Sequence, residues 1–207
     1  MLQLKTINKD TLDLLKELSL KSEISEFYLA GGTALALQIG HRVSVDLDFF
    51  TSDEFDSTAL LENVENRFVT DNSSVAANSL SLFIKSYESY IKVDFIRHGY
   101  PILSPAITTG DIRLCSLEDI AAMKMNAVAN RGAKKDFFDI YALLAQFSLK
   151  EMITFFEEKY RKRNSFTVTK SLAYFDDADM DPDPISLIAA SWEEIKACIK
   201  LKLRESF

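Results

Sequence analysis

The sequence predicts an α+β fold, in which a mixed β-sheet core is flanked by helices and followed by a C-terminal helical region. Short segments in the first half of the chain alternate polar and apolar residues, as half-buried strands do. The second half has apolar residues at helical spacing and signals for helix starts. A hydrophobic content of 47% with only 6 Gly and 4 Pro is typical of a packed globular protein.

The first half is predicted to begin with a helix and to continue with strands. Asn8 or Asp10 can cap the first helix, and a later glycine pair opens a helical turn that Gly40 closes in the left-handed conformation. The expected elements are a helix at 6–22, a strand at 27–30, a helical turn at 31–41, a strand at 42–50, a helix at 57–68 and two strands within 79–97.

The second half is predicted to be mainly helical after a proline-containing loop and a short strand near 112–114. Ser116 and Asp119 form the Ser-x-x-acid pattern that caps a long helix, and this capping explains Asp119. The remaining expected features are a break at Arg131-Gly132, a helix at 134–147 and a loop at 176–184 that ends in a linker-like stretch.

Charge and cysteine content limit the function classes. A net charge of −7 disfavours broad adhesion to nucleic-acid backbones, so any contact with nucleic acid should be local. The 2 cysteines have no neighbouring ligands, which indicates neither a disulfide framework nor a zinc site. No segment is apolar enough for a signal peptide or a membrane span, so we expect a cytoplasmic protein with no membrane partner.

The segment at 42–50 contains a candidate metal site. Side chains alternate between the two faces of an extended segment, so Ser44, Asp46 and Asp48 share one face. Two aspartates at i and i+2 lie about 6–7 Å apart at their bases, close enough to share Mg²⁺ ions. An Asp-x-Asp pattern is more often a solvated strand edge, but this one follows a glycine turn at the distance that a strand-helix-strand unit requires.

The glycine turn itself is a candidate phosphate site. Gly31, Gly32 and Thr33 stand where a helix begins, and backbone N–H groups at such a turn bind anionic oxygens. A glycine pair alone usually marks only a turn, so this pattern depends on its neighbours.

Asp94 is a candidate third carboxylate. It shares one face of a predicted strand with Lys92, so it can lie beside the first aspartate pair and complete a metal cage. Taken alone, this segment is equally typical of a purely structural strand.

The predicted helices after Ser116 carry further charged candidates. Lys124 and Arg131 are seven residues apart and lie on nearly the same helix face, where two cations can meet one polyphosphate. The structural alternative is that Lys135 and Asp139 form a simple surface pair, while Asp136 complements a helix dipole.

Five motifs follow one another along the chain: Gly31-Gly32-Thr33, Arg42-x-Ser44-x-Asp46-Leu47-Asp48-Phe49, Lys92-Val93-Asp94-Phe95, Lys124, and Arg131-Gly132-x-Lys134-Lys135-Asp136-x-x-Asp139. In this order and spacing they resemble the AbiEii-type nucleotidyltransferases, which are toxins of type IV toxin–antitoxin and abortive-infection systems. A more distant resemblance connects them to the DNA polymerase beta nucleotidyltransferase superfamily. The match covers about residues 26–145, and no motif is recognised after residue 150.

We expect a nucleotidyltransferase core at 1–115 and a helical region at 116–207 packed on that core. Thr33 stands where the superfamily often has Ser and keeps the hydroxyl group. The implied ligands of Mg²⁺ or Mn²⁺ are Asp46, Asp48 and Asp94. Of these three, Asp94 is the carboxylate that the family requires least uniformly. The resemblance and the residue patterns together predict Asp46, Asp48, Lys124 and Asp136 as catalytic residues. The predicted nucleotide-binding residues are Gly31, Gly32, Thr33, Ser44, Lys124, Arg131 and Asp139.

The activity that the resemblance implies is transfer of a nucleotide from a nucleoside triphosphate (NTP) to an acceptor hydroxyl. It suggests a tRNA 3′ end as one acceptor class and a separately encoded antitoxin as a protein partner. A small hydroxylated molecule or a protein side chain remains an alternative acceptor, mildly favoured by the acidic charge. A further alternative is a partner-binding domain without catalytic activity. The retained charged residues argue against it.

Overall fold

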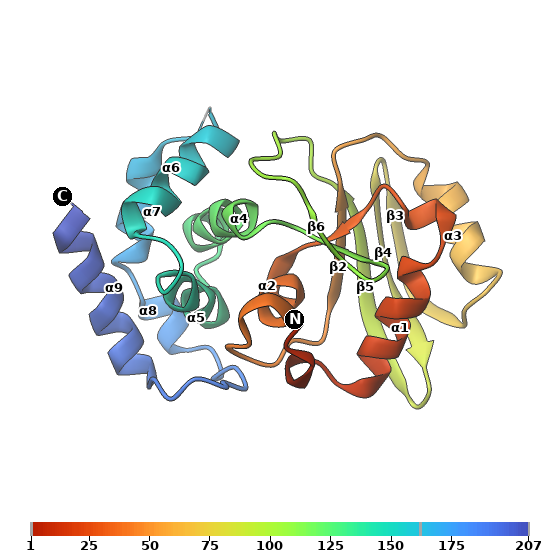
Figure 1. Ribbon diagram of the computed structural model, residues 1–207, viewed down its shortest axis with the longest axis horizontal. Coiled ribbons are helices and arrows are strands. Elements are labelled where there is room, and N and C mark those ends of the chain that lie inside the picture. The colour runs from red at the N-terminus through yellow and green to blue at the C-terminus, as the bar shows by residue number, and fades with distance from the viewer. Residues whose placement is uncertain (1, 162, 207) are drawn as a thin grey trace. The chain divides into compact units, whose positions relative to one another are not determined.

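The chain, described by a computed structural model over residues 2–161 and 163–206, divides into two units (Figure 1). Unit 1 contains the β-sheet and consists of Met1–Gly40, Ser44–Tyr100 and Pro105–Cys115. Unit 2 contains the C-terminal helices and consists of His41–Val43, Pro101–Ser104 and Ser116–Phe207. Two short segments of the first half of the chain therefore group with the helical unit.

Unit 1 is built on a mixed sheet, which has seven strands within the described residues. The strand order is β3-β4-β5-β2-β1-β7-β6, with β2 parallel to β5, β1 parallel to β7 and the other neighbours antiparallel. The strands are β1 (Tyr28–Leu29), β2 (Leu47–Thr51), β3 (Thr70–Ala76), β4 (Ser79–Ser86), β5 (Ser89–Arg97), β6 (Ile107–Thr109) and β7 (Ile112–Leu114). The predicted mixed sheet with flanking helices is confirmed.

The helices of unit 1 begin and end at recognisable signals. The side chain of Asn8 accepts a hydrogen bond from the Thr11 N–H at the start of α1, and Asp56 caps α3 in the same way. Gly40 ends α2 with φ of 84°, the left-handed conformation predicted for it. Figure 1 shows α1 and α3 beside the strands and α2 next to β2. The helices are η1 (Leu4–Thr6), α1 (Lys9–Ser19), η2 (Ser22–Ile24), α2 (Gly31–Ile39) and α3 (Ser57–Glu65).

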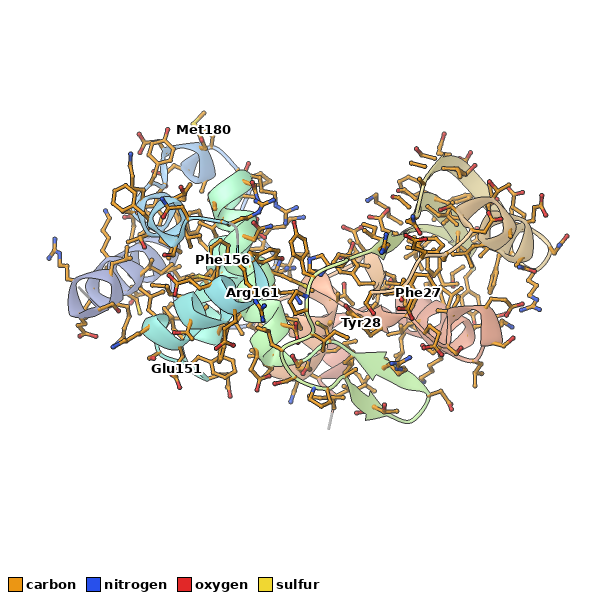
Figure 2. All side chains as sticks on the ribbon, turned by 90° about the horizontal axis from the view of Figure 1, so that it is seen from above. Phe27, Tyr28, Glu151, Phe156, Arg161 and Met180 are labelled. Carbon is orange, nitrogen blue, oxygen red and sulfur yellow. The ribbon has the colours of Figure 1, made fainter. Side chains whose placement is uncertain are left out.

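Aromatic side chains fill the apolar face of the sheet. Phe49 on β2 stacks on Phe95 on β5 with ring centroids 5.2 Å apart, and Phe27 meets Phe95 edge-on at 5.4 Å. All three are buried, and Figure 2 shows Phe27 among the side chains of unit 1. Because this face is apolar, the alternate residues of β2 and β5 are left for the opposite face of the sheet.

Unit 2 is helical, as predicted, and its long helices start at capping serines. The Ser116 side chain accepts from the Asp119 N–H at the start of α4, and Ser148 forms a capping box with Glu151 at the start of α6. Phe156 lies among the buried residues of this unit, whereas Met180 extends into solvent (Figure 2). The helices are α4 (Leu117–Asn130), α5 (Lys134–Leu143), α6 (Leu149–Lys159), α7 (Ser165–Leu172), α8 (Asp176–Asp179) and α9 (Trp192–Ser206).

The prediction of a strand across 42–50 was wrong in its first half, because β2 begins only at Leu47. Residues 41–43 instead pair within unit 2: Arg42 forms a bridge with Ser186, and the Val43 N–H donates to the Ile185 carbonyl. Val45, expected on an apolar face, is 53% exposed. Pairing with residues 185 and 186, far along the chain, therefore decides the backbone conformation here, and the local alternation of polar and apolar residues does not.

Two strands and the short helix α8 were not predicted, and neither were the 3₁₀ helices η1 and η2. β3 has the polar sequence TDNSSVA and is almost wholly exposed, so it has no apolar alternation to reveal it. It pairs with β4 at the edge of the sheet, with an irregularity between Asp71 and Ser74. The strand β6 lies within the expected loop, and α8 lies within the expected stretch at 176–184.

Asp119 does more than the predicted helix cap. Its carboxylate lies 2.5 Å from Lys159 Nζ and accepts hydrogen bonds from the backbone N–H groups of Leu103 and Ser104. The Lys159 ammonium also donates to the Pro101 carbonyl at 2.8 Å, and its side chain is 0% exposed. This buried ion pair fastens residues 101–104 to unit 2.

Among the described residues, no helix combines the length and the apolar character that crossing a membrane requires.

Replacing Lys159 by Met is expected to lower the free energy of unfolding by about 3–5 kcal/mol, because it leaves the buried Asp119 carboxylate without its cation. Urea denaturation would measure this. Lys150→Met is the matched control, since Lys150 lies exposed on the same helix and its loss should change stability by less than about 0.5 kcal/mol. Equal effects of the two substitutions would contradict the assignment.

Candidate active site

The parallel pairing of β2 with β5 brings two candidate carboxylates together. In this register Asp48 lies directly opposite Asp94, between the paired residues Leu47 and Val93 on one side and Phe49 and Phe95 on the other. The apolar neighbours face the core, so both aspartates lie on the opposite, polar face of the sheet. Asp94 is mostly buried there, with 12% of its side chain exposed.

A lysine lies among these carboxylates. Lys92 precedes Asp94 by two residues on β5 and therefore shares its face, and Lys92 Nζ is 2.5 Å from Asp94 Oδ2. Partial burial favours a lower pKa for Lys92, but its hydrogen bond with Asp94 and the charges of Asp94, Asp48 and Asp46 together raise the pKa. The three candidate metal ligands thus act on one cation.

Asp46 is held by its backbone just before β2 begins. The Thr33 hydroxyl donates to the Asp46 carbonyl, and the same hydroxyl is 2.9 Å from the Ser44 Oγ. The Ser44 N–H donates to the Thr6 carbonyl at 2.8 Å. Thr33 is buried, so in this structure its hydroxyl group positions the Asp46 segment.

Glycine is required at position 31 because the backbone approaches Asp48 closely. Gly31 has φ of +66°, a conformation that residues with a Cβ adopt at a cost. A methyl group there would collide with the Asp48 carboxylate, whose Cγ would be 3.1 Å away. The first turn of α2 thus lies beside Asp48, with only hydrogen atoms as side chains at Gly31 and Gly32.

The residue types around Lys92 suit a divalent cation. Carboxylate oxygens are the ligands that Mg²⁺ and Mn²⁺ prefer, and the combined charge of Asp46, Asp48 and Asp94 attracts a cation to this face. Over residues 2–161 and 163–206, no three His, Cys, Asp or Glu side chains are arranged as a group that could hold a metal ion. The three-carboxylate cage therefore stays a prediction.

Unit 2 contains a buried cluster of charges centred on Asp139. Arg42 donates to both Asp139 oxygens, from Nε at 2.7 Å and from Nη2 at 3.0 Å. Lys124 Nζ lies 2.6 Å from Asp139 Oδ2, and His41 Nε2 lies 2.6 Å from Oδ1. The Asp139 side chain is 0% exposed, so the surface pair with Lys135 considered above is wrong.

Asp136 extends this cluster toward solvent. Its carboxylate accepts from Arg131 Nε and Nη2 at 2.7 and 2.9 Å, and it lies 3.1 Å from Lys124 Nζ. The two cations that were expected to meet a polyphosphate therefore meet one carboxylate in this structure. The Arg131 side chain is 56% exposed, whereas that of Lys124 is 6% exposed.

Burial and opposite charges compete in setting the pKa values of this cluster. Burial alone raises the pKa of Asp139, but the charges of Lys124 and Arg42 and the hydrogen bonds from His41 and Arg42 hold it well below its usual value. Burial by itself lowers the pKa of Lys124, but the charges of Asp139 and Asp136 raise this pKa above its usual value. Asp139, Lys124 and Arg42 are consequently charged at neutral pH, and each depends on its partners.

Three members of these clusters, Lys92, Arg42 and His41, were not predicted as site residues. Lys92 and Arg42 both stand inside the motifs quoted above, but neither was given a function. The signal for Lys92 was its position two residues before Asp94 on the same strand face. No local signal could show that Arg42 pairs with Asp139, because the two are 97 residues apart in the chain.

Gly31→Ala should destabilise the protein more than Gly110→Ala. Both positions have positive φ, so each substitution should cost about 1–2 kcal/mol. Nothing lies within 4 Å of a methyl group at Gly110, whereas at Gly31 the methyl displaces Asp48 and should add about 1–3 kcal/mol. Chemical denaturation of both variants tests this, and equal losses would show that the Asp48 contact imposes no constraint.

Asp139→Asn should lower the free energy of unfolding by about 3–5 kcal/mol at pH 7, because Arg42 and Lys124 remain buried without their shared anion. The pKa of Asp139 is lower in the folded protein, so its stabilisation is full above the unfolded pKa of about 3.9 and is lost as the pH falls below it. The difference from wild type should therefore shrink on acidification. Urea unfolding between pH 7 and pH 3 measures it, with the exposed Asp111→Asn as a charge-matched control. A difference independent of pH would refute this origin.

Comparison with known proteins adds an independent observation. A protein of Aquifex aeolicus, aq_aa25, is 34% identical over 208 residues, which cover 98% of each chain. Among solved structures, a candidate nucleotidyltransferase from H. pylori aligns with a TM-score of 0.60 and 16% identity over 96% of this chain and 97% of the other. JHP933 from Helicobacter pylori aligns with a TM-score of 0.58 and 16% identity over 97% and 94%. The two structural likenesses show a shared fold.

The family that matches is described as the nucleotidyl transferase AbiEii toxin of type IV toxin–antitoxin systems, and the match extends over residues 13–205. It includes both the carboxylate face of unit 1 and the buried charges of unit 2, and it confirms the resemblance that the five motifs indicated. The chain belongs to the AbiEii nucleotidyltransferase toxin family.

Proposed function

We propose that this protein transfers a nucleotide from an NTP to an acceptor hydroxyl, with Asp46 and Asp48 as the principal ligands of Mg²⁺ or Mn²⁺. The observation that carries the proposal is the polar face of the sheet, where Asp48 lies opposite Asp94, beside the start of α2 and around Lys92. A divalent metal bound there would neutralise phosphate charge and polarise the reacting phosphoryl group.

The start of α2 is suited to the phosphates. Helix N-termini carry backbone N–H groups and the positive end of the helix dipole, both of which attract anions. The glycines at positions 31 and 32 allow a phosphate to approach the backbone without a side chain in the way. Thr33 and Ser44, both predicted to bind nucleotide, are proposed to support this turn through their hydrogen bond and their hold on the Asp46 segment.

The chemical step is a substitution at the α-phosphorus. The acceptor oxygen forms a bond to phosphorus, the bond between phosphorus and the bridging oxygen breaks, and pyrophosphate leaves with that electron pair while the hydroxyl proton passes to water. Asp46 and Asp48 are proposed to be catalytic through the metal, and Asp94 to be a third ligand.

Within unit 2, Lys124, Arg131, Asp136 and Asp139 remain proposed nucleotide-binding and catalytic residues. Arg131 has the strongest claim to phosphate contact, because more than half of its side chain is exposed while Asp136 orients its guanidinium group. Lys124 and Asp139 are buried together, so we propose that they act mainly by holding the cluster in place.

A tRNA 3′ end is the proposed acceptor, a separately encoded antitoxin the proposed protein partner, and the cytoplasm the proposed location. The family is a type IV toxin–antitoxin family, which supports an antitoxin. The acidic net charge of −7 keeps a small molecule or a protein side chain as the alternative acceptor.

The test incubates purified protein with Mg²⁺ or Mn²⁺ and each α-labelled NTP, in separate reactions with total tRNA, small metabolites or cell protein. Label should enter tRNA, and Asp46→Ala/Asp48→Ala should reduce the rate at least about 100-fold, because it removes several kcal/mol of charge stabilisation. Asp53→Ala/Asp111→Ala, at two exposed positions with the same charge change, should retain the wild-type rate.

Each failure has a distinct meaning. Wild-type transfer by the Asp46→Ala/Asp48→Ala variant would refute the metal assignment. Label that enters metabolites or protein instead of tRNA would replace the acceptor. Transfer to none of the three would refute the enzymatic function and favour an inactive partner-binding domain.

A further inference from the structure

We infer that Lys92 is the built-in counterion of the carboxylate site and competes with divalent metal for the Asp94 carboxylate. This inference rests on the proposed metal-binding function of Asp46 and Asp48, and it goes beyond that function by identifying what occupies the site before metal arrives. As a result, Lys92 lowers the affinity of the protein for divalent metal when no nucleotide is bound.

The contact between Lys92 and Asp94 is direct and local. The two side chains lie on one face of β5, and the ammonium nitrogen is 2.5 Å from Asp94 Oδ2. On the neighbouring strand β4, the residues opposite them are Phe83 and Ser81, neither of which carries a charge. The anions that act on Lys92 therefore come from β5 itself and from the β2 segment.

The β2 segment supplies two further carboxylates. Leu47 pairs with Val93, and Asp46 and Lys92 directly precede these two residues in the chain. Asp48 follows Leu47 and lies opposite Asp94. Three negative charges close together repel one another, so a cation among them lowers the electrostatic energy of the folded protein. Lys92 provides one positive charge there.

The exposure of Lys92 distinguishes it from the buried, ion-paired lysines Lys124 and Lys159. Its side chain is 40% exposed, compared with 6% for Lys124 and 0% for Lys159. The Lys92 ammonium can therefore move into water, and a cation that arrives in its place keeps the mostly buried Asp94 carboxylate compensated. A divalent ion carries twice the charge of an ammonium group, so it can replace Lys92 at Asp94. An incoming triphosphate then offers the displaced ammonium a new anionic partner, which couples metal binding to nucleotide binding.

The test titrates Mn²⁺ without nucleotide into wild-type protein and its variants, with free Mn²⁺ followed by electron paramagnetic resonance. Lys92→Met should bind Mn²⁺ about tenfold more tightly, because the competing cation is gone and the carboxylates stay. Lys92→Arg, which keeps the charge, should remain within about twofold of wild type. The matched control is Lys85→Met, an exposed lysine on β4 with the same charge change, which should also stay within about twofold.

Circular dichroism and thermal unfolding establish that the variants are folded, and Lys92→Gln provides a second substitution that must reproduce the tightening. Unchanged or weaker Mn²⁺ affinity in both neutral variants would overturn the inference. The proposed metal site would survive that result as long as Asp46→Ala/Asp48→Ala abolishes Mn²⁺ binding. Absence of Mn²⁺ binding from every variant, or binding that persists in Asp46→Ala/Asp48→Ala, would refute the metal site and this inference with it.

Discussion

The parallel pairing of β2 with β5 decides which side chains meet on the polar face of unit 1. Phe49 stacks on Phe95 on the other face of the same two strands, and this packing holds the register. A slip by one residue would turn the phenylalanines outward and the aspartates inward, so burial of the aromatic rings also fixes Asp48 opposite Asp94. The position of the carboxylates is therefore a consequence of how the hydrophobic core packs.

Buried charge has a different function in unit 2. Asp139 binds Arg42, Lys124 and His41, and loss of its carboxylate would leave the charges of Arg42 and Lys124 uncompensated away from water. The Asp119–Lys159 pair obeys the same rule around residues 101–104. Arrangements of the helices that separate these charges are disfavoured, because each charge would then be buried without its partner. The ion pair of Lys92 lacks this constraint because it borders on solvent, and an exchangeable function suits it better than a structural one.

Local signals predicted the fold well and the long-range contacts poorly. Ser116 begins α4 and Gly40 ends α2 as expected, because a cap depends on a few neighbouring residues. Asp48 and Asp94 were expected on adjacent strands, and the sheet brings them together. Arg42 was expected on a strand beside the aspartates, but it pairs with Asp139 far along the chain. Spacing also cannot show which face of a helix is buried, so Asp139 was as compatible with a surface pair as with a buried hub.

The polar sequence of the outermost strand β3 prevented its prediction, and the same polarity suits a strand at the edge of a sheet. A strand at the end of a sheet leaves one row of backbone groups open to pairing with other chains. The polar side chains of β3, its irregular register between Asp71 and Ser74, and the left-handed conformation of Asn72 make that row a poor template. The edge at β3 is therefore a poor partner for the edge strand of another molecule, which disfavours growth of the sheet from one molecule to the next on that side.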